Sequence, residues 1–203
     1  MKKLILASSS PYRAELLRKL GLPFDTLAPE IDEAARPSER PEALVLRLAE
    51  EKASAVARRR GDALVIGSDQ VAVSEGEILG KPGTEERAQA QLARLSGRAV
   101  LFHTGLCLLD AESGHAQTTV VTTAVTFRTL TGEEIRDYVA RERPVDCAGS
   151  FKSEGLGIAL FEAIEGPDPN ALVGLPLIEL CRMLRAAGVN VLGRNQEKAV
   201  HAS

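Results

Sequence analysis

The sequence contains no tryptophan, and aromatic residues make up only 3 % of its 203 residues. Each tyrosine or phenylalanine is therefore a candidate for a specific role. Long apolar runs are also missing, so no segment reaches the length that a membrane span needs. The apolar start, residues 4–7, is too short for the core of a signal peptide. We therefore expect a soluble, cytoplasmic protein without a membrane partner.

Cysteine and histidine are scarce, and neither shows the spacing of a metal site or a catalytic triad. The three cysteines are Cys107, Cys147 and Cys181, and their odd number and scattered positions favour reduced, buried thiols in a reducing cytosol. The three histidines are equally scattered. The sequence also lacks a Walker A motif and a Gly-x-Gly-x-x-Gly motif. It therefore offers no standard nucleotide-binding loop.

The overall charge separates two classes of nucleotide ligand. A net charge of −3 and a pI of about 5.7 argue against binding to nucleic-acid polymers, which requires a basic face. A small phosphorylated ligand needs only a local basic pocket and stays compatible with this charge. Hydrophobic residues amount to 44 %, enough for one core. We expect a single domain of two lobes over residues 1–192 and a polar C-terminal tail over residues 193–203. A homodimer is compatible with the sequence, although no exposed apolar stripe identifies an interface.

Strand and helix signals are mixed along the chain and predict an α/β fold. Ser10, Thr84 and the Thr131–Glu134 capping box mark three helix starts, and residues 42–60 show helical spacing of apolar side chains. Hairpins in the middle of the chain predict a mixed sheet rather than a wholly parallel one. Further helical pieces are expected after residues 168–169 and 175–176. The expected strands are residues 3–7, 24–27, 63–66, 71–73, 78–79, 98–110, 118–128 and 147–161.

The stretch of residues 63–82 concentrates the candidate chemistry. An apolar strand that we expect to break at Gly67 delivers Asp69 to a strand end, and a Glu-Gly hairpin turn predicts that Gln70 faces Lys81. Ligands gather at the carboxyl ends of strands in open α/β sheets. Asp69 beside Lys81 is therefore our candidate catalytic carboxylate. A buried, hydrogen-bonded aspartate after a strand is the alternative.

The run from Ser8 to Arg13 places hydroxyls and free backbone N–H groups at a strand-to-helix junction. Helix N-termini bind anions through such N–H groups and through the helix dipole. A cation such as Arg13 in the first turn is unfavourable unless an anion accompanies it. We favour a phosphate contact over the alternative, an ordinary serine cap with an exposed arginine.

Lys52 lies on the apolar face of the helix predicted over residues 42–60. Taken alone, it is best explained by a side chain that extends outward along its methylene groups to place the ammonium in water. Taken with Arg13 and Lys81, it predicts several cations converging on one polyphosphate.

The acidic loop at residues 30–33 has two readings. It is either a solvated surface run, or it supplies a carboxylate partner for Asp69 at a divalent cation. Magnesium commonly takes one or two carboxylates together with substrate phosphate oxygens, so two such residues would suffice.

Several short motifs are spread over nearly the whole chain: LASSSPYR at residues 6–13, DE at 32–33, EKA at 51–53, GSDQ at 67–70, GKP at 80–82, CAGSFKSEG at 147–155 and DPNALVGLP at 168–176. Together they resemble the Maf family of nucleoside triphosphate pyrophosphatases, over about residues 3–192. The resemblance implies a mixed α/β fold with an elongated central sheet flanked by helices, in two lobes around a cleft, similar to inosine triphosphatases. It also implies hydrolysis of a nucleoside triphosphate to the monophosphate and pyrophosphate, with Mg²⁺ or Mn²⁺ as cofactor.

The resemblance also implies roles for individual residues. Asp69 matches the proton acceptor of the family, and Glu33 matches an acidic site residue. We expect these two carboxylates to hold the metal ion. The positions that match the phosphate site are Ser8, Arg13, Lys52 and Lys81.

The motifs GSDQ and GSFKSE resemble those of family members that act on 7-methylguanosine triphosphate (7-methyl-GTP), and Tyr12, Gln70 and Glu154 match the positions tied to specificity. Methylation at N7 makes guanine cationic, so an aromatic face gains a cation–π attraction and a carboxylate offsets the added charge. One alternative is a pyrophosphatase of the dTTP/UTP type. Another is a nucleotide-binding regulator of cell division in which hydrolysis is incidental.

Overall fold

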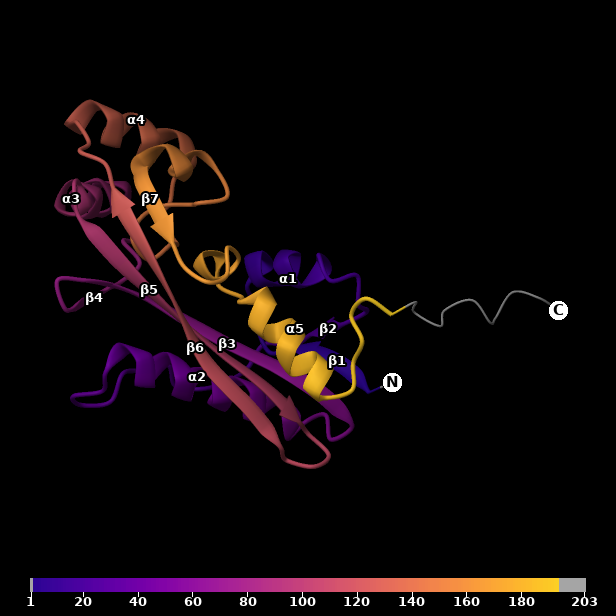
Figure 1. Cartoon of the computed structure of the whole chain (residues 1–203). Coiled ribbons are helices and arrows are strands. Elements are labelled where there is room, and N and C mark those ends of the chain that lie inside the picture. Colours follow the sequence, from indigo (N-terminus) through magenta and orange to yellow (C-terminus); the bar gives the residue numbers. More distant parts are fainter. Residues whose placement is uncertain (1, 194–203) are drawn as a thin grey trace.

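A computed structural model gives the fold of the protein and describes residues 2–193 (Figure 1). The strands are β1 (Lys3–Leu6), β2 (Asp25–Thr26), β3 (Ala63–Ser74), β4 (Glu77–Leu79), β5 (Ala99–Asp110), β6 (Ala116–Phe127) and β7 (Phe161–Glu165). The α-helices are α1 (Pro11–Arg18), α2 (Pro41–Ala57), α3 (Glu85–Leu95), α4 (Gly132–Glu142) and α5 (Leu177–Ala186), and two 3₁₀ helices are η1 (Leu156–Leu160) and η2 (Ala171–Val173). Apart from Gly193, the predicted C-terminal tail lies outside the described residues.

The strands form one seven-stranded sheet in the order β2-β1-β3-β5-β6-β7, with β4 also paired to β3. β1 runs parallel to β2 and β3, and all the other pairs are antiparallel. β3, β5 and β6 are 12 residues each and give the sheet its length. The prediction of an α/β fold with a mixed, elongated sheet is confirmed.

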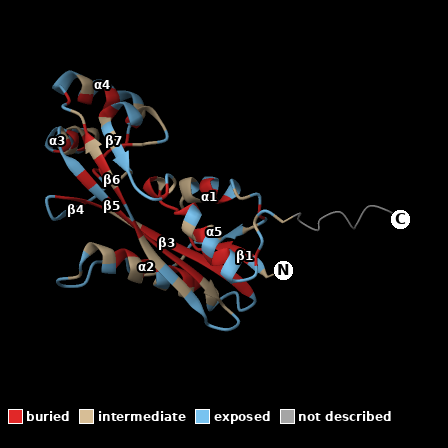
Figure 2. Cartoon of the chain, in the orientation of Figure 1, coloured by how far each residue is buried: buried red, intermediate tan, exposed pale blue. Residues whose placement is uncertain are grey.

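Helices cover the two faces of the sheet differently. α2 packs on one face through Ala49, Ala53 and Val56, against Val65 and Cys107. On the other face, α1 and α5 pack on one end of the sheet, and α3 and α4 pack on the opposite end. Figure 1 shows these two helix pairs apart from each other along the strands, and Figure 2 shows the buried residues concentrated in the strands and in the helix sides that face them. We call the two ends the α1–α5 lobe and the α3–α4 lobe.

One edge of β3 is open in its middle. β1 pairs with residues 63–66 of β3, and β4 pairs with residues 72–74 on the same side, because β5 occupies the other side. In the described chain, residues 67–71 therefore have no strand neighbour on that side. The Ser-Asp-Gln run lies in this opening, between the two lobes.

The predicted break of the strand at Gly67 is wrong, because β3 continues from Ala63 to Ser74. Gly67 instead allows α2 to approach the sheet: a Cβ at this position would overlap the carbonyl oxygen of Ala49. Gly105 on β5, which pairs with Asp69, does the same at the carbonyl of Val45. A glycine inside a strand often marks such a close backbone approach rather than a strand end.

The strand predicted over residues 147–161 is also wrong, since this segment consists of turns followed by η1, and only β7 is extended. Gly149 and Ser150 have φ values of 80° and 59°, which a strand does not accommodate. The predicted turn at Glu75-Gly76 is confirmed, with positive φ at both residues. Its ladder ends at the Ala72–Leu79 pair, so Gln70 and Lys81 are not paired.

Local signals at helix starts were reliable. Ser10 and Thr84 accept a hydrogen bond from the backbone three residues on, and Thr131 and Glu134 form the complete capping box. All three cysteines are free; Cys107 is buried, and the other two are half-buried. Across residues 2–193, no helix has the length and apolar character to cross a membrane.

Candidate functional site

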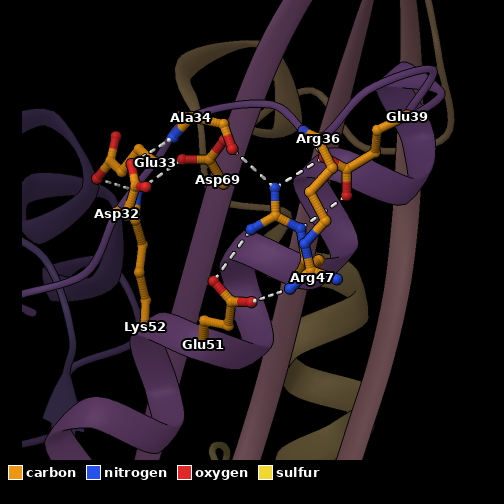
Figure 3. A network of polar contacts seen from close by, with 9 residues as sticks. All are labelled: Asp32, Glu33, Ala34, Arg36, Glu39, Arg47, Glu51, Lys52 and Asp69. Carbon is orange, nitrogen blue, oxygen red and sulfur yellow. Dashed lines mark hydrogen bonds and ion pairs between the residues drawn. The ribbon is translucent and has the colours of Figure 1, made fainter.

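The centre of the candidate site is an ammonium group held between two carboxylates. Lys52 Nζ, on α2, lies 2.6 Å from Asp69 Oδ1 on β3 and 2.9 Å from Glu33 Oε1 on the loop before α2 (Figure 3). Lys52 is only 5 % exposed and Asp69 8 %, because α2 approaches the sheet so closely. The lysine therefore points inward to Asp69 and not outward to solvent. Three elements distant in the sequence meet at one charged group.

This arrangement fits a substrate-bridged divalent cation. Lys52 contacts one oxygen of each carboxylate, so the second oxygen of Asp69 and of Glu33 is left, in the described structure, for a metal ion or water. Within residues 2–193, no group of three or more His, Cys, Asp or Glu side chains could hold a metal ion by itself. Two carboxylates completed by substrate phosphate oxygens and water would suit Mg²⁺ or Mn²⁺.

The junction between β1 and α1 brings a hydroxyl and a guanidinium to the same place. Ser8 is buried, and its Oγ accepts a hydrogen bond from Ser10 N at 3.1 Å, which leaves its O–H free to donate. Arg13 Nε donates to the carbonyl of Gly174 at 2.8 Å, which ties α1 to the segment before α5. Burial lowers the pKa of the Arg13 guanidinium, and the negative charges of Asp69 and Glu33 oppose that shift. Arg13 lines the same cleft as these two carboxylates.

One cleft of about 840 Å³ contains every site residue predicted from the sequence. It opens where β3 has its free edge, between the α1–α5 lobe and the α3–α4 lobe. Lys81 is exposed at its border, just after β4. The predicted residues that line it are Ser8, Tyr12, Arg13, Glu33, Lys52, Asp69, Gln70, Lys81 and Glu154.

The cleft also combines an aromatic ring with negative charge. Half-buried Tyr12 lines it together with Asp146 and Glu154 and with the apolar side chains of Phe151 and Leu172. Burial raises the pKa of the Tyr12 hydroxyl, and the carboxylates of Asp146 and Glu154 raise it further. This part of the cleft is suited to a flat group that carries positive charge.

The side chain of Gln70 is fixed by hydrogen bonds to other residues that line or flank the cleft. Its Nε2 donates hydrogen bonds to Thr104 Oγ1, Ala171 O and Leu172 O, at 2.9, 2.8 and 3.1 Å. The amide nitrogen therefore holds η2 against the sheet. Only Oε1 of this side chain is left to face a ligand.

Sequence reasoning missed Asp146, Leu172 and Gly174. Asp146 had no signal of its own, because only the fold brings it to Tyr12, on the other side of the cleft. Gly174 accepts hydrogen bonds from Arg13 and from Ser68 Oγ, and its φ of 113° explains the glycine. The DPNALVGLP motif at residues 168–176 contains Leu172 and Gly174 but does not reveal their contacts.

A second cavity, of about 620 Å³, lies at the edge of the sheet near β2. Arg18, Asp25 and Arg60 line it together with apolar side chains, and none of the predicted site residues takes part. It has no carboxylate–lysine cluster comparable to that of the main cleft.

The comparisons with known proteins agree with the sequence motifs and with the fold. A 7-methyl-GTP pyrophosphatase of Nitrosococcus oceani is 59 % identical over 189 residues, which cover 93 % of this chain and 95 % of that protein. The Ham1 protein of Staphylococcus aureus shares the fold with a TM-score of 0.52 at 13 % identity, over 92 % of this chain and all of that one. The model of the Maf family, described as Maf-like protein, matches residues 3–187. The chain therefore belongs to the Maf family.

Proposed function

We propose that this protein is a nucleoside triphosphate pyrophosphatase that hydrolyses 7-methyl-GTP to the monophosphate and pyrophosphate. The observation that carries the proposal is the Lys52 ammonium held between Asp69 and Glu33 in a cleft. That cleft is lined by the cations Arg13, Lys52 and Lys81 and by the aromatic ring of Tyr12 together with Asp146 and Glu154. The identity of 59 % to a protein named 7-methyl-GTP pyrophosphatase supports the substrate.

The reaction is attack of water on the α-phosphorus. The water oxygen forms a bond to the α-phosphorus, the bond from that phosphorus to the bridging oxygen breaks, and pyrophosphate leaves with its electron pair. Asp69 accepts the proton of the attacking water through its oxygen that Lys52 does not engage. Lys52 holds the carboxylate in place, because its hydrogen bond fixes the other oxygen.

Asp69 and Glu33 would hold a divalent cation, which would supply charge neutralisation and polarise the reacting oxygen. The chain's own cations act on the leaving group. Arg13 and Lys81 offset the negative charge on the departing pyrophosphate, and the free O–H of Ser8 donates to a phosphate oxygen.

Base selection rests on the part of the cleft that Tyr12, Asp146 and Glu154 line. The Tyr12 ring stacks on the cationic 7-methylguanine, while Asp146 and Glu154 offset its charge and accept hydrogen bonds from its edge. Gln70 acts on this part of the cleft through η2, because its amide nitrogen fixes the backbone that carries Leu172.

The test is pyrophosphate release from 7-methyl-GTP, GTP, UTP and dTTP with magnesium, by the wild type and by Asp69→Asn. We expect the wild type to prefer 7-methyl-GTP and the variant to lose the reaction. Preference for UTP or dTTP would keep the mechanism and overturn the assignment of the base. Retained nucleotide binding without hydrolysis of any substrate would favour the regulator of cell division. A cytoplasmic location and a homodimer stay predictions of the sequence.

A further inference from the structure

Glu33 lies on a segment that has little support from its own backbone. The chain between β2 and α2 has neither helix nor strand. In the described structure, the backbone of residues 28–35 makes no hydrogen bond with another backbone group. The Glu33 side chain is itself 59 % exposed, and ion pairs with such exposed groups contribute little free energy. The Glu33–Lys52 contact is therefore too weak to fix this segment alone.

A half-buried arginine on α2 provides the support that the backbone lacks. Arg47 NH2 donates a hydrogen bond to the carbonyl of Ala34, the residue after Glu33, at 3.1 Å. The same guanidinium makes a bidentate pair with Glu39, with Nε–Oε1 and NH2–Oε2 both at 2.7 Å. The side chains of Arg47 and Glu39 are only 14 % and 9 % exposed, so water competes little for these bonds. The guanidinium fork joins both ends of residues 34–39 to α2 (Figure 3).

Neighbouring residues extend this support and connect it to the site. Glu39 Oε2 accepts a hydrogen bond from Arg36 N at 2.9 Å, and Arg36 NH2 donates to Glu51 Oε1 at 3.1 Å. Glu51 Oε2 in turn accepts from Arg47 NH1 at 3.1 Å. Glu51 immediately precedes Lys52 on α2. The residue that binds Arg36 of the loop and the ammonium that Glu33 contacts are therefore neighbours on one helix.

We propose that Arg47 is a positioning residue: paired with Glu39, it fixes residues 33–39 so that the Glu33 carboxylate stays beside Lys52 and Asp69. The proposal rests on the proposed function for its effect on the reaction. The support is needed when ligands bind, because a divalent cation would compete with Lys52 for the carboxylate of Glu33, and nucleotide phosphates would compete with Glu33 for the ammonium of Lys52. A second anchor then keeps Glu33 in place.

Arg47→Gln tests the proposal, since it removes the charge and the fork and keeps a polar side chain. We expect kcat to fall about 10- to 100-fold, the usual effect of losing a partner that orients a metal-binding carboxylate, with a smaller change in KM. We also expect a higher magnesium concentration for half-maximal rate. Arg182→Gln is the matched control, because Arg182 Nε also lies 2.7 Å from a glutamate on its own helix, Glu179, but outside the cleft. The control should keep the wild-type rate.

A double-mutant cycle separates positioning from a general structural role. If Arg47 acts through Glu33, then Glu33→Gln/Arg47→Gln should be no slower than Glu33→Gln alone, within about twofold. A multiplied loss in the double variant would overturn the proposal, because Arg47 would then act by another route. Arg47→Lys should recover little, since an ammonium cannot form the bidentate pair.

A readout without metal or substrate tests the loop directly. The bond after Glu30 should be cleaved by a glutamate-specific protease about tenfold faster in Arg47→Gln than in the wild type, because the loop opens locally more often. Equal cleavage would overturn the proposal whatever the activity shows. A wild type that hydrolyses none of the nucleotides would overturn the proposed function only, and the cleavage rates would still decide whether Arg47 holds the loop.

Discussion

Lys52 and Asp69 form an ion pair inside the molecule, with Nζ 2.6 Å from Oδ1. The pair joins α2 to β3 at the open edge of the strand, and both residues are buried. Each partner therefore has two tasks, because it compensates the other's charge and faces the cleft.

Asp69→Asn should separate these tasks. The amide keeps the size of the side chain and loses the proton acceptor, so kcat should fall about 10²- to 10⁴-fold. Nucleotide affinity should change much less. Pyrophosphate release measures the first effect, and binding of a non-hydrolysable GTP analogue measures the second. A variant that retained most of its kcat would remove Asp69 from the role of proton acceptor.

Lys52→Met should cost stability as well as activity. It leaves two carboxylates without their shared cation, and breaking a buried pair by removing one partner costs about 3–5 kcal/mol. Urea unfolding at pH 7 measures the loss. Lys3→Met, on the exposed first residue of β1, is the control and should stay within about 0.5 kcal/mol of the wild type. A Lys52 variant as stable as the control would contradict a buried pair.

Gly67→Ala should disturb the approach of α2 to the sheet. The added Cβ would overlap the carbonyl oxygen of Ala49, so the helix must move, at a cost of about 1–3 kcal/mol. The displacement also separates Lys52 from Asp69 and lowers activity. Gly61→Ala is the matched control, because a Cβ there meets nothing within 4 Å. Unfolding midpoints and pyrophosphate release of both variants provide the test.

Asp146→Asn should weaken selection of the charged base. The substitution removes a negative charge beside Tyr12, where we propose a cation–π contact with the base. The ratio of kcat/KM for 7-methyl-GTP over GTP should therefore fall by about 5- to 10-fold, equivalent to about 1 kcal/mol. Asp137→Asn, on the exposed side of α4, is the control for a general charge effect. An unchanged ratio in Asp146→Asn would place the base elsewhere in the cleft.

Glu39 should make folding depend on pH in the acid range. The Arg47 guanidinium lowers the pKa of Glu39 from its ordinary 4.5 to about 2, with a smaller contribution from the Arg36 backbone. A lowered folded-state pKa stabilises the protein above pH 4.5, and the contribution disappears as the pH falls through 4.5 to 2. Wild type should therefore exceed Glu39→Gln in urea midpoint at pH 7, and the difference should vanish near pH 2. Glu15→Gln, exposed on α1, is the control for the loss of one carboxylate.

The sequence predicted those features that depend on a few neighbouring residues. The caps at Ser10 and Thr131 and the turn at Glu75-Gly76 need only local hydrogen bonds or a positive φ, and all three are confirmed. Gly67 was misread because a glycine that ends a strand and a glycine that admits a helix look the same in a sequence. The second case depends on α2, a remote element.

The site shows the same limit. The family motifs identified residues that share one cleft, but no motif revealed that Lys52 is paired with Asp69 and Glu33. Gln70 matches a position tied to specificity, and the sequence could not predict that its amide nitrogen donates to the backbone of η2. The support of the acidic loop by Arg47 depends on contacts that only the packed helix provides.

The three long strands have a further consequence for the ligand. β3, β5 and β6 each run without interruption from the α1–α5 lobe to the α3–α4 lobe. These shared strands, and not a linker, therefore set the distance between the two lobes. Tyr12 lies on α1 in the first lobe, whereas Asp146 and Glu154 follow α4 in the second. The continuous sheet therefore sets the width of the cleft between Tyr12 and these two carboxylates.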